Sequence, residues 1–355
     1  MLSYQVETFG RPLARVLRET PQPQGTEVLV QVGHCGVCHS DLHLQDGYFD
    51  LGGGNKIDMS RPMGLPRTLG HEIAGTVVAL GPGVTAADGV QVGDRRVVFP
   101  WIGCGECATC ARGDEHLCGA PRALGANRDG GYATHVMVPH PRVLLEYDPV
   151  PEAQACTLAC SGLTAYSALR KIGPLAAGDA LLVIGAGGVG LSGIRLAKQL
   201  LGVAPIVAEL DRAKWDVARE AGAAEVFDPT AEGAAKALMK STGGGVAAAV
   251  DFVGAGASFG FGLGALRKGG RLVCVGLFGG NAPVVPAILS MKAVSIVGSY
   301  VGSLVELREL LAFARAGRMP AMPVATRPLD EASQALDDLR AGKIKGRAVL
   351  TPDGP

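Results

Sequence analysis

The stretch from Leu181 to Glu209 limits the possible folds of this 355-residue chain more than any other. Four apolar residues run into a glycine-rich turn, Gly185–Gly190, and an apolar pattern with helical spacing follows. A second apolar strand then ends on Glu209, 24 positions beyond Gly185 and close to the ~20 expected for a carboxylate that holds the ribose hydroxyls. This order of strand, turn, helix and strand predicts a dinucleotide-binding unit, whose glycines let a pyrophosphate approach the helix N-terminus. Because the chain contains 52 glycines, a glycine-rich turn without a ligand is the alternative.

Strands and helices alternate throughout residues 180–298, whereas the preceding part of the chain has short strands separated by glycine and proline turns. We expect strands at 28–32, 73–79, 95–99, 181–184, 206–209, 225–227, 248–252, 271–275 and 294–297, and helices at 214–221 and 304–316. Alternation of this kind is typical of a doubly wound parallel sheet. The sequence therefore predicts an α/β protein with a β-rich domain at 1–160 and 299–355 and a dinucleotide-binding domain at 161–298.

Four of the 9 cysteines lie in one short polar loop, namely Cys104, Cys107, Cys110 and Cys118. Thiolates with this spacing can surround Zn²⁺ tetrahedrally, and four protein ligands leave no coordination position for a substrate. Free cysteines are more often buried singly among apolar residues. The loop therefore predicts a structural zinc, with disulfide pairs or four free thiols as the alternatives.

Three further residues have the chemistry of a reactive zinc site, which needs three protein ligands and one open position. Cys38, His71 and Cys160 offer two thiolates and one imidazole, although each taken singly could be a packing residue. We expect Asp41 to hydrogen-bond the ring of His71 and fix its tautomer, as is usual for ligating histidines. Glu72 is expected either to support its neighbour His71 or to bind the metal transiently.

The composition excludes several classes of protein. Lys plus Arg and Asp plus Glu both total 33, so there is no basic excess to attract nucleic acid. A formal net charge of zero favours self-association. The chain has no signal-peptide pattern and no apolar run near ~18 residues, so neither secretion nor a membrane span is expected. Zinc thiolates and an odd number of cysteines favour a reducing compartment, and we expect a cytoplasmic enzyme.

Read together, these motifs resemble the zinc-dependent alcohol dehydrogenases of the medium-chain dehydrogenase/reductase superfamily. The resemblance spans nearly the whole chain and rests on Gly70-His71-Glu72, the four-cysteine loop, the segment 160–164 and the dinucleotide turn. Segments 121–125 and 276–279 look most like the bacterial and archaeal tetrameric branch. The resemblance implies a GroES-like catalytic domain, a Rossmann coenzyme domain, two zinc ions per chain, NAD, and a homotetramer or homodimer.

The resemblance also implies the residues that contact the coenzyme. They would be His39, Thr164, Gly185, Gly187, Gly188, Val189, Gly190, Glu209, Leu210 and Arg347. Within this set, His39 and Arg347 would reach the pyrophosphate and Thr164 the nicotinamide. His39 departs from the family pattern, since some members carry Arg there, and Glu209 stands where many carry Asp. The Glu209 carboxylate should repel the additional phosphate of NADP, so NAD is expected.

Family positions suggest a proton path and a substrate pocket as well. Ser40 and His43 match residues that relay the alcohol proton to solvent, although His43 could instead be a solvated surface residue. Trp101, Ala123 and Ala126 match pocket positions, and Trp101 could equally be a core residue. The two alanines predict a roomy pocket that accepts bulky primary, secondary or aromatic alcohols and their carbonyl products. The polar segment 47–67 is expected to be a loop, either a plain surface loop or one shaping the substrate entrance.

Three other functions are weighed against reversible hydride transfer between an alcohol and NAD. In polyol and amino-alcohol dehydrogenases of the same fold, Glu commonly replaces the third zinc ligand, so Cys160 argues against them. A zinc-free NADPH-dependent quinone or enoyl reductase would lack Cys38 and His71. A non-enzymatic zinc-ribbon interaction protein would leave the reactive metal site and the nucleotide turn without a use.

Overall fold

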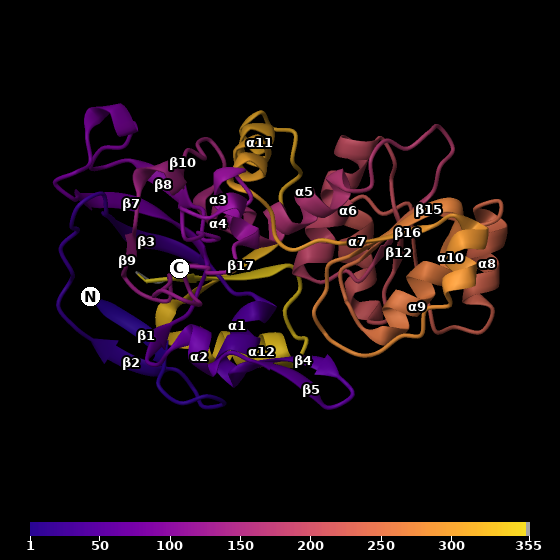
Figure 1. Cartoon of the computed structure of the whole chain (residues 1–355), viewed down its shortest axis with the longest axis horizontal. Helices are drawn as coiled ribbons and strands as arrows, with labels where there is room; N and C mark the ends of the chain where they lie inside the picture. The colour runs from indigo at the N-terminus through magenta and orange to yellow at the C-terminus, as the bar shows by residue number, and fades with distance from the viewer. Residues whose placement is uncertain (353–355) are drawn as a thin grey trace. The chain divides into compact units, whose positions relative to one another are not determined.

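The computed structural model describes residues 1–352, and its chain divides into two compact units (Figure 1). Unit 1 contains residues 1–48, 58–163 and the chain from 303 onward, and unit 2 contains residues 49–57 and 164–302. The predicted domain boundaries differ from these units mainly at 49–57, a segment that groups with unit 2.

Unit 1 is built on a sheet with the strand order β10-β8-β7-β3-β18-β17, to which β9 adds by pairing with β3. Its pairs are antiparallel except for β17 and β18, and β2-β1-β6 form a second small antiparallel sheet. The strands are β1 (Leu2–Val6), β2 (Ala14–Leu17), β3 (Val28–Gly36), β6 (Arg67–Thr68), β7 (Glu72–Leu80), β8 (Arg95–Val98), β9 (His135–Val138), β10 (Leu144–Leu145), β17 (Val324–Pro328) and β18 (Arg347–Thr351).

The longest strands of this sheet, β3 and β7, carry apolar residues toward the interior. Val28, Val30 and Val32 of β3 alternate with other residues and are fully or almost fully buried, as expected for a strand with one face in the core. The pairing register of β3 with β7 shifts between Val32 and His34, so Gly33 lies at an irregularity of the ladder. Such a bulge changes the direction of the following side chains.

Helices and helical turns connect the strands of unit 1. They are α1 (His39–Asp46), α2 (Ser60–Met63), η1 (Ala86–Asp88), α3 (Ala108–Ala111), η2 (Glu115–Leu117), η3 (Pro141–Val143), α4 (Glu152–Thr157), the π-helical turn η4 (Leu158–Gly162), α11 (Leu304–Arg315), η6 (Leu329–Glu331) and α12 (Ala332–Arg340). Two of them matter for the site, because α1 begins directly after Cys38 and η4 carries Cys160.

Unit 2 contains a six-stranded sheet with the order β13-β12-β11-β14-β15-β16, and all neighbouring strands are parallel. The strands are β11 (Leu181–Ile184), β12 (Ile206–Ala208), β13 (Glu225–Phe227), β14 (Val246–Asp251), β15 (Leu266–Cys274) and β16 (Ser295–Gly298). The helices are α5 (Leu163–Arg170), α6 (Gly188–Leu201), η5 (Arg212–Lys214), α7 (Trp215–Glu220), α8 (Ala234–Ser241), α9 (Gly256–Ala265) and α10 (Pro286–Lys292). This order is that of a Rossmann domain, which confirms the predicted fold class.

The buried strands of unit 2 read as continuous apolar runs, as expected for parallel strands covered on both faces. All four residues of β11 and all six of β14 are buried. Leu182 and Ile184 pack with Ala249 and Leu272 in one core cluster, and α9 packs against β11, β14 and β15. The observed β14 and β15 begin earlier than predicted, because their first residues pair across a register shift between Val246 and Ala248.

The segment 47–67 is not the irregular loop that the sequence suggested. It forms a two-stranded hairpin of β4 (Tyr48–Gly52) and β5 (Asn55–Asp58), followed by α2. The turn of the hairpin needs its glycines, since Gly52, Gly53 and Gly54 all have positive φ angles. Within unit 2 the hairpin is held by the Gly280 amide, which donates to the Leu51 carbonyl at 3.1 Å.

Across residues 1–352, no helix has both the length and the apolar character needed to cross a membrane.

Candidate metal centres and coenzyme site

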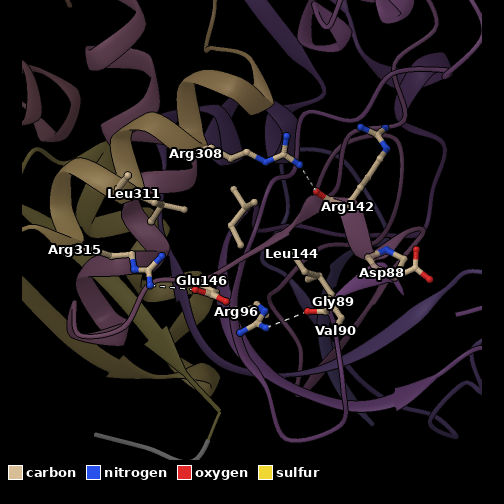
Figure 2. Close-up of a pocket in the computed structure, with 13 residues that line it drawn as sticks. Asp88, Gly89, Val90, Arg96, Arg142, Leu144, Glu146, Arg308, Leu311 and Arg315 are labelled. Atoms are coloured by element: carbon tan, nitrogen blue, oxygen red, sulfur yellow. Dashed lines mark hydrogen bonds and ion pairs between the residues drawn. The ribbon is translucent and has the colours of Figure 1, made fainter. Parts of the chain in front are cut away.

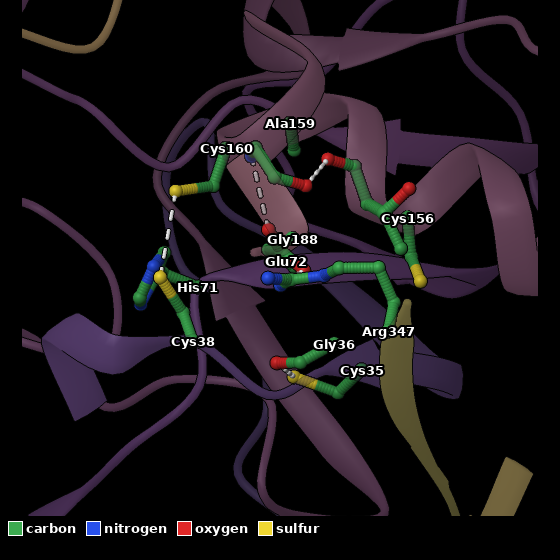
Figure 3. A network of polar contacts seen from close by, with 12 residues as sticks. Cys35, Gly36, Cys38, His71, Glu72, Cys156, Ala159, Cys160, Gly188 and Arg347 are labelled. Carbon is green, nitrogen blue, oxygen red and sulfur yellow. Dashed lines mark hydrogen bonds and ion pairs between the residues drawn. The ribbon is translucent and has the colours of Figure 1, made fainter. Parts of the chain in front are cut away.

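Three buried side chains of unit 1 meet at a single point (Figure 3). Cys38 follows β3 and stands at the N-terminus of α1, His71 directly precedes β7, and Cys160 lies in the π-helical turn η4. Their Sγ and ring nitrogen atoms all lie within 4.8 Å of one another. Segments far apart in the sequence thus bring together the three residues predicted to bind a reactive zinc.

The orientation of the His71 ring is fixed by Asp41, which contacts the ring nitrogen Nδ1. Its Nδ1 lies 3.2 Å from Oδ1 of Asp41, and the carboxylate holds the pKa of His71 well above its usual range although burial opposes this. Its buried Nε2 has no hydrogen-bond partner anywhere in residues 1–352. A ring that donates from Nδ1 keeps its lone pair on Nε2, so this otherwise unsatisfied atom is suited to bind a metal.

Asp41 is itself fully buried and accepts bonds from several directions. The Cys38 amide donates to Oδ2 at 3.0 Å, the Tyr132 hydroxyl donates to Oδ2 at 2.9 Å, and the Gly70 amide donates to Oδ1 at 3.2 Å. The carboxylate therefore connects two of the three ligand segments, because it binds the Cys38 amide, the Gly70 amide and the His71 ring. Tyr132 has no signal in the sequence and was not among the predicted site residues.

The two sulfur atoms of the site lie 4.0 Å apart, too far for a disulfide bond. Two thiolates on one tetrahedral zinc would be about 3.8 Å apart, given Zn–S bonds of about 2.3 Å. The hydrogen bond with Cys160 lowers the pKa of Cys38 well below its usual range, and the same contact raises that of Cys160. Two thiols that share a proton in this way, next to an unsatisfied imidazole nitrogen, fit a zinc ion with one position left for substrate.

Glu72 and Arg347 form a buried ion pair beside the ligands. Oε1 of Glu72 accepts a hydrogen bond from the Ser161 amide at 3.0 Å, directly after Cys160. Burial raises the pKa of Glu72, and the charge of Arg347 opposes the shift. Glu72 thus supports the Cys160 segment, whereas the predicted contact of Arg347 with a pyrophosphate stays a prediction.

Trp101 lies beside His71, and its predicted place in a substrate pocket stays a prediction. It is buried, its Nε1 donates to the Ala159 carbonyl at 2.9 Å, and its ring centre is 5.1 Å from that of His71. Ala123 is buried and Ala126 is half-buried on the loop beyond the four-cysteine segment. Trp101 thereby excludes water from one side of His71, and the part of the two alanines in a substrate pocket stays a prediction.

The predicted proton-relay residues lie on α1, which begins next to Cys38. Ser40 and His43 are half-buried, and His39 is exposed. Both predicted relay residues are thus partly accessible to solvent, on a helix that begins next to a metal ligand. The relay itself, and the contact of His39 with the coenzyme, stay predictions.

The four-cysteine loop closes on itself in unit 1. Its sulfur atoms lie within 4.8 Å of one another, with Cys107 3.6 Å from Cys110 and 3.8 Å from Cys118. The Cys110 amide donates to the Cys107 sulfur and, with the neighbouring thiols, lowers the pKa of Cys107 to about 6. All four cysteines are free of disulfides. Four converging sulfurs fit a structural zinc.

The glycine-rich turn of unit 2 has the geometry of a nucleotide site. Gly185 has a φ of +91°, and a Cβ on Gly190 would lie 2.0 Å from the Gly185 carbonyl oxygen, so both positions require glycine. Gly187 caps α6, whose free amides form an anion site. The Glu209 carboxylate lies over the turn, where it accepts from the Ala186 amide at 2.6 Å and the Asp211 amide at 2.9 Å.

For the other predicted coenzyme residues, the structure shows only their position and burial. Gly188 and Val189 begin α6, Thr164 is buried on α5, and Leu210 is 61% exposed. The exposure of Leu210 gives it no packing role within unit 2, and a contact with the coenzyme stays a prediction.

A hollow of about 330 Å³ in unit 1 lies between α11 and the strands β8 and β10 (Figure 2). Four arginines line it, and three of them are paired with carboxylates: Arg96 with Asp94, Arg142 with Glu115 and Arg315 with Glu146. It contains none of the candidate metal ligands and no nucleophile. The hollow is therefore not a candidate active site.

Comparison with known proteins agrees with this geometry. The family descriptions "Alcohol dehydrogenase GroES-like domain" and "Zinc-binding dehydrogenase" match residues 24–149 and 188–316. The chain is 36% identical to NAD-dependent alcohol dehydrogenases of Sulfurisphaera tokodaii and Saccharolobus solfataricus, over 99% of its own length and 100% of theirs. The chain belongs to the zinc-binding alcohol dehydrogenases.

Solved structures place it in the same family. The crystal structure of the alcohol dehydrogenase from Aeropyrum pernix matches with a TM-score of 0.88 at 31% identity, covering 99% of this chain and 100% of that one. As a zinc-binding alcohol dehydrogenase, the protein is an NAD-dependent oxidoreductase whose cofactors are zinc and NAD.

Proposed function

We propose that this protein oxidises primary or secondary alcohols to aldehydes or ketones with NAD and catalyses the reverse reduction. One observation carries the proposal: a buried site with two sulfurs and a histidine whose Nε2 has no other partner within the described chain. The test combines metal analysis with an assay of NADH formation. Two zinc ions per chain and alcohol-dependent NADH formation are expected, and one zinc or none would contradict the proposal.

In this mechanism the chain holds the reactants and moves one proton. Zinc at Cys38, His71 and Cys160 supplies Lewis acidity that favours loss of the hydroxyl proton, and NAD supplies the hydride acceptor. Asp41 keeps the His71 ring in the tautomer that leaves Nε2 free. Trp101 packs on that ring and keeps water away from it.

The proton of the alcohol needs a path to solvent. Ser40 would take it through its hydroxyl, and His43 would release it, since an imidazole can both accept and release a proton. Both lie on α1, which begins at the metal ligand Cys38, and both are partly exposed. In the reduction of carbonyl compounds, the proton would move along the same path from solvent to the substrate oxygen.

The substrate is proposed to be a bulky or aromatic alcohol. The small side chains of Ala123 and Ala126 support this proposal, together with the aromatic face of Trp101 beside His71. A panel containing ethanol, 2-butanol, cyclohexanol, benzyl alcohol, sorbitol and threonine separates the possibilities. Highest kcat/KM with the aromatic or cyclic alcohols supports the proposal, and highest kcat/KM with sorbitol or threonine would favour a polyol or amino-alcohol dehydrogenase.

We also propose a homotetramer, or a homodimer, in the cytoplasm. Strand β16 is the last strand of its sheet, and an unpaired edge is a place where another chain can add. Val285, Ile288 and Met291 of the α10 region are 53%, 48% and 77% exposed in the single chain. Light scattering after size-exclusion chromatography tests the assembly, and a monomer would refute it.

A further inference from the structure

Helix α4 connects the metal site to a carboxylate that none of the preceding roles uses. Glu152 is the first residue of α4, and the helix runs directly into the π-helical turn that carries Cys160. The turn follows α4 without a break, so the position of the Cys160 sulfur depends in part on how α4 is held.

The Glu152 carboxylate contacts three different parts of unit 1. Its Oε1 lies 3.0 Å from Nδ1 of His34 on β3. Its Oε2 accepts from Nη2 of Arg95 on β8 at 3.2 Å and from the Tyr147 hydroxyl. The side chain is only 13% exposed. Burial alone would raise the pKa of Glu152, but these hydrogen bonds outweigh burial and hold it at about 2.

The backbone of β3 is shaped to receive this carboxylate. A Cβ on Gly33 would lie 1.9 Å from Oε1 of Glu152, so the carboxylate rests directly on the glycine. Gly33 is also the position at which the register of β3 and β7 shifts. The bulge and the missing side chain together let His34 and Glu152 meet.

The elements that Glu152 contacts lie next to the three metal-ligating residues in the sequence or in the sheet. β3 ends two residues before Cys38, and β8 pairs with β7, which begins directly after His71. α4 leads to Cys160. One carboxylate thus fixes the helix of one ligand against the strands that set the other two.

We propose that Glu152 is a positioning residue that sets the Cys160 sulfur at bonding distance from the metal held by Cys38 and His71. This inference rests on the proposed function, because it takes these three residues as the zinc ligands. A residue that only stabilised the fold would lower the melting temperature without a selective change at one of the two metal sites.

The test uses Co²⁺, whose absorption bands report the geometry and the sulfur ligands of each site. Co²⁺ is titrated into the full-length apoprotein of wild type and Glu152→Gln, and the affinity of each site is obtained by competition with a chelator. Glu152→Gln keeps the size of the side chain but removes the charge that His34 and Arg95 share. We expect the affinity of the three-ligand site to fall by about 10–100-fold, with altered bands, since partners that orient ligands have effects of this size.

A matched control comes from the other metal site. Glu115 is buried, pairs with Arg142 at 2.7 Å and accepts from the amide of Gly103, next to Cys104. Glu115→Gln should weaken the four-cysteine site and leave the three-ligand site unchanged, the opposite selectivity to Glu152→Gln. Equal weakening of both sites in Glu152→Gln, or an unchanged three-ligand site, would overturn the inference.

Arg95→Gln decides the question if Glu152→Gln does not fold. Arg95 is 48% exposed, so its replacement should be tolerated, with a loss of about 10-fold at the three-ligand site, the low end for such partners. An unchanged affinity in this variant would then overturn the inference. If wild type binds only one Co²⁺, it is the proposed function that fails, and the two failures are therefore distinguishable.

Discussion

Replacing Asp41 by Asn should damage the reactive metal site more than its small change in size suggests. The four groups around the carboxylate are all donors: the His71 ring, the Tyr132 hydroxyl and the amides of Cys38 and Gly70. Asn has one acceptor oxygen and one NH₂ group. Whichever way its amide is turned, the NH₂ group faces a backbone amide that cannot accept a bond.

The magnitude follows from that unmatched donor. A buried donor without a partner costs about 1–3 kcal/mol. If the amide nitrogen faces His71, the ring must also move its proton to Nε2, the atom needed by the metal. We therefore expect zinc affinity at the three-ligand site to fall by about 10–100-fold, with the four-cysteine site unaffected.

The assay is chelator competition on both sites together with thermal unfolding. Asp129→Asn is the control, because Asp129 also accepts from a backbone amide, that of Thr68, and pairs with Arg67, but is 38% exposed and bonds neither a metal ligand nor its amide. Unchanged zinc affinity in Asp41→Asn, or an equal loss in both variants, would refute the reasoning about the His71 tautomer.

Four further outcomes are expected. Glu209→Ala should raise the KM for NAD more than that for NADP, and equal kcat/KM with the two coenzymes in wild type would contradict the NAD assignment. Cys110→Ser should lower the melting temperature and remove one zinc of two, as metal analysis would show. His43→Gln should lower kcat by no more than about 10²-fold, with a deficit that shrinks at high pH; a pH–rate profile identical to that of wild type would exclude the relay. The pKa of Glu152 is held at about 2 in the folded state, below the unfolded value of about 4.3, so its ionisation contributes about 3 kcal/mol to the free energy of unfolding. This contribution should be present above about pH 4.3 and be lost as the pH falls toward 2. Denaturant titration of Glu152→Gln against wild type would detect the loss.

The sequence predicted those residues of the site whose side chains have a characteristic chemistry and spacing. Cys38, His71 and Cys160 could be proposed because thiolates and imidazoles have few uses in combination, and the structure brings them together. The six strands of unit 2 could be predicted because buried parallel strands are continuous apolar runs.

The partners of these residues could not be predicted in the same way. Tyr132 and Glu152 act through single hydrogen bonds to residues far away in the sequence, and no local pattern marks them. The hairpin at 48–58 was missed because a polar, glycine-rich segment has the composition of a loop. Its strands exist because three glycines at positive φ angles close the turn between them.

The π-helical turn at Leu158–Gly162 makes the length of this segment as important as its composition. The Leu163 amide donates to the Leu158 carbonyl, five residues back, so the turn holds one residue more than a turn of α-helix. Deleting a single residue between α4 and α5 would allow an uninterrupted α-helix. The helical side chains that follow the deletion would then be rotated by about 100° about the helix axis. A deletion between α4 and Cys160 would therefore turn the Cys160 sulfur away from Cys38 and His71.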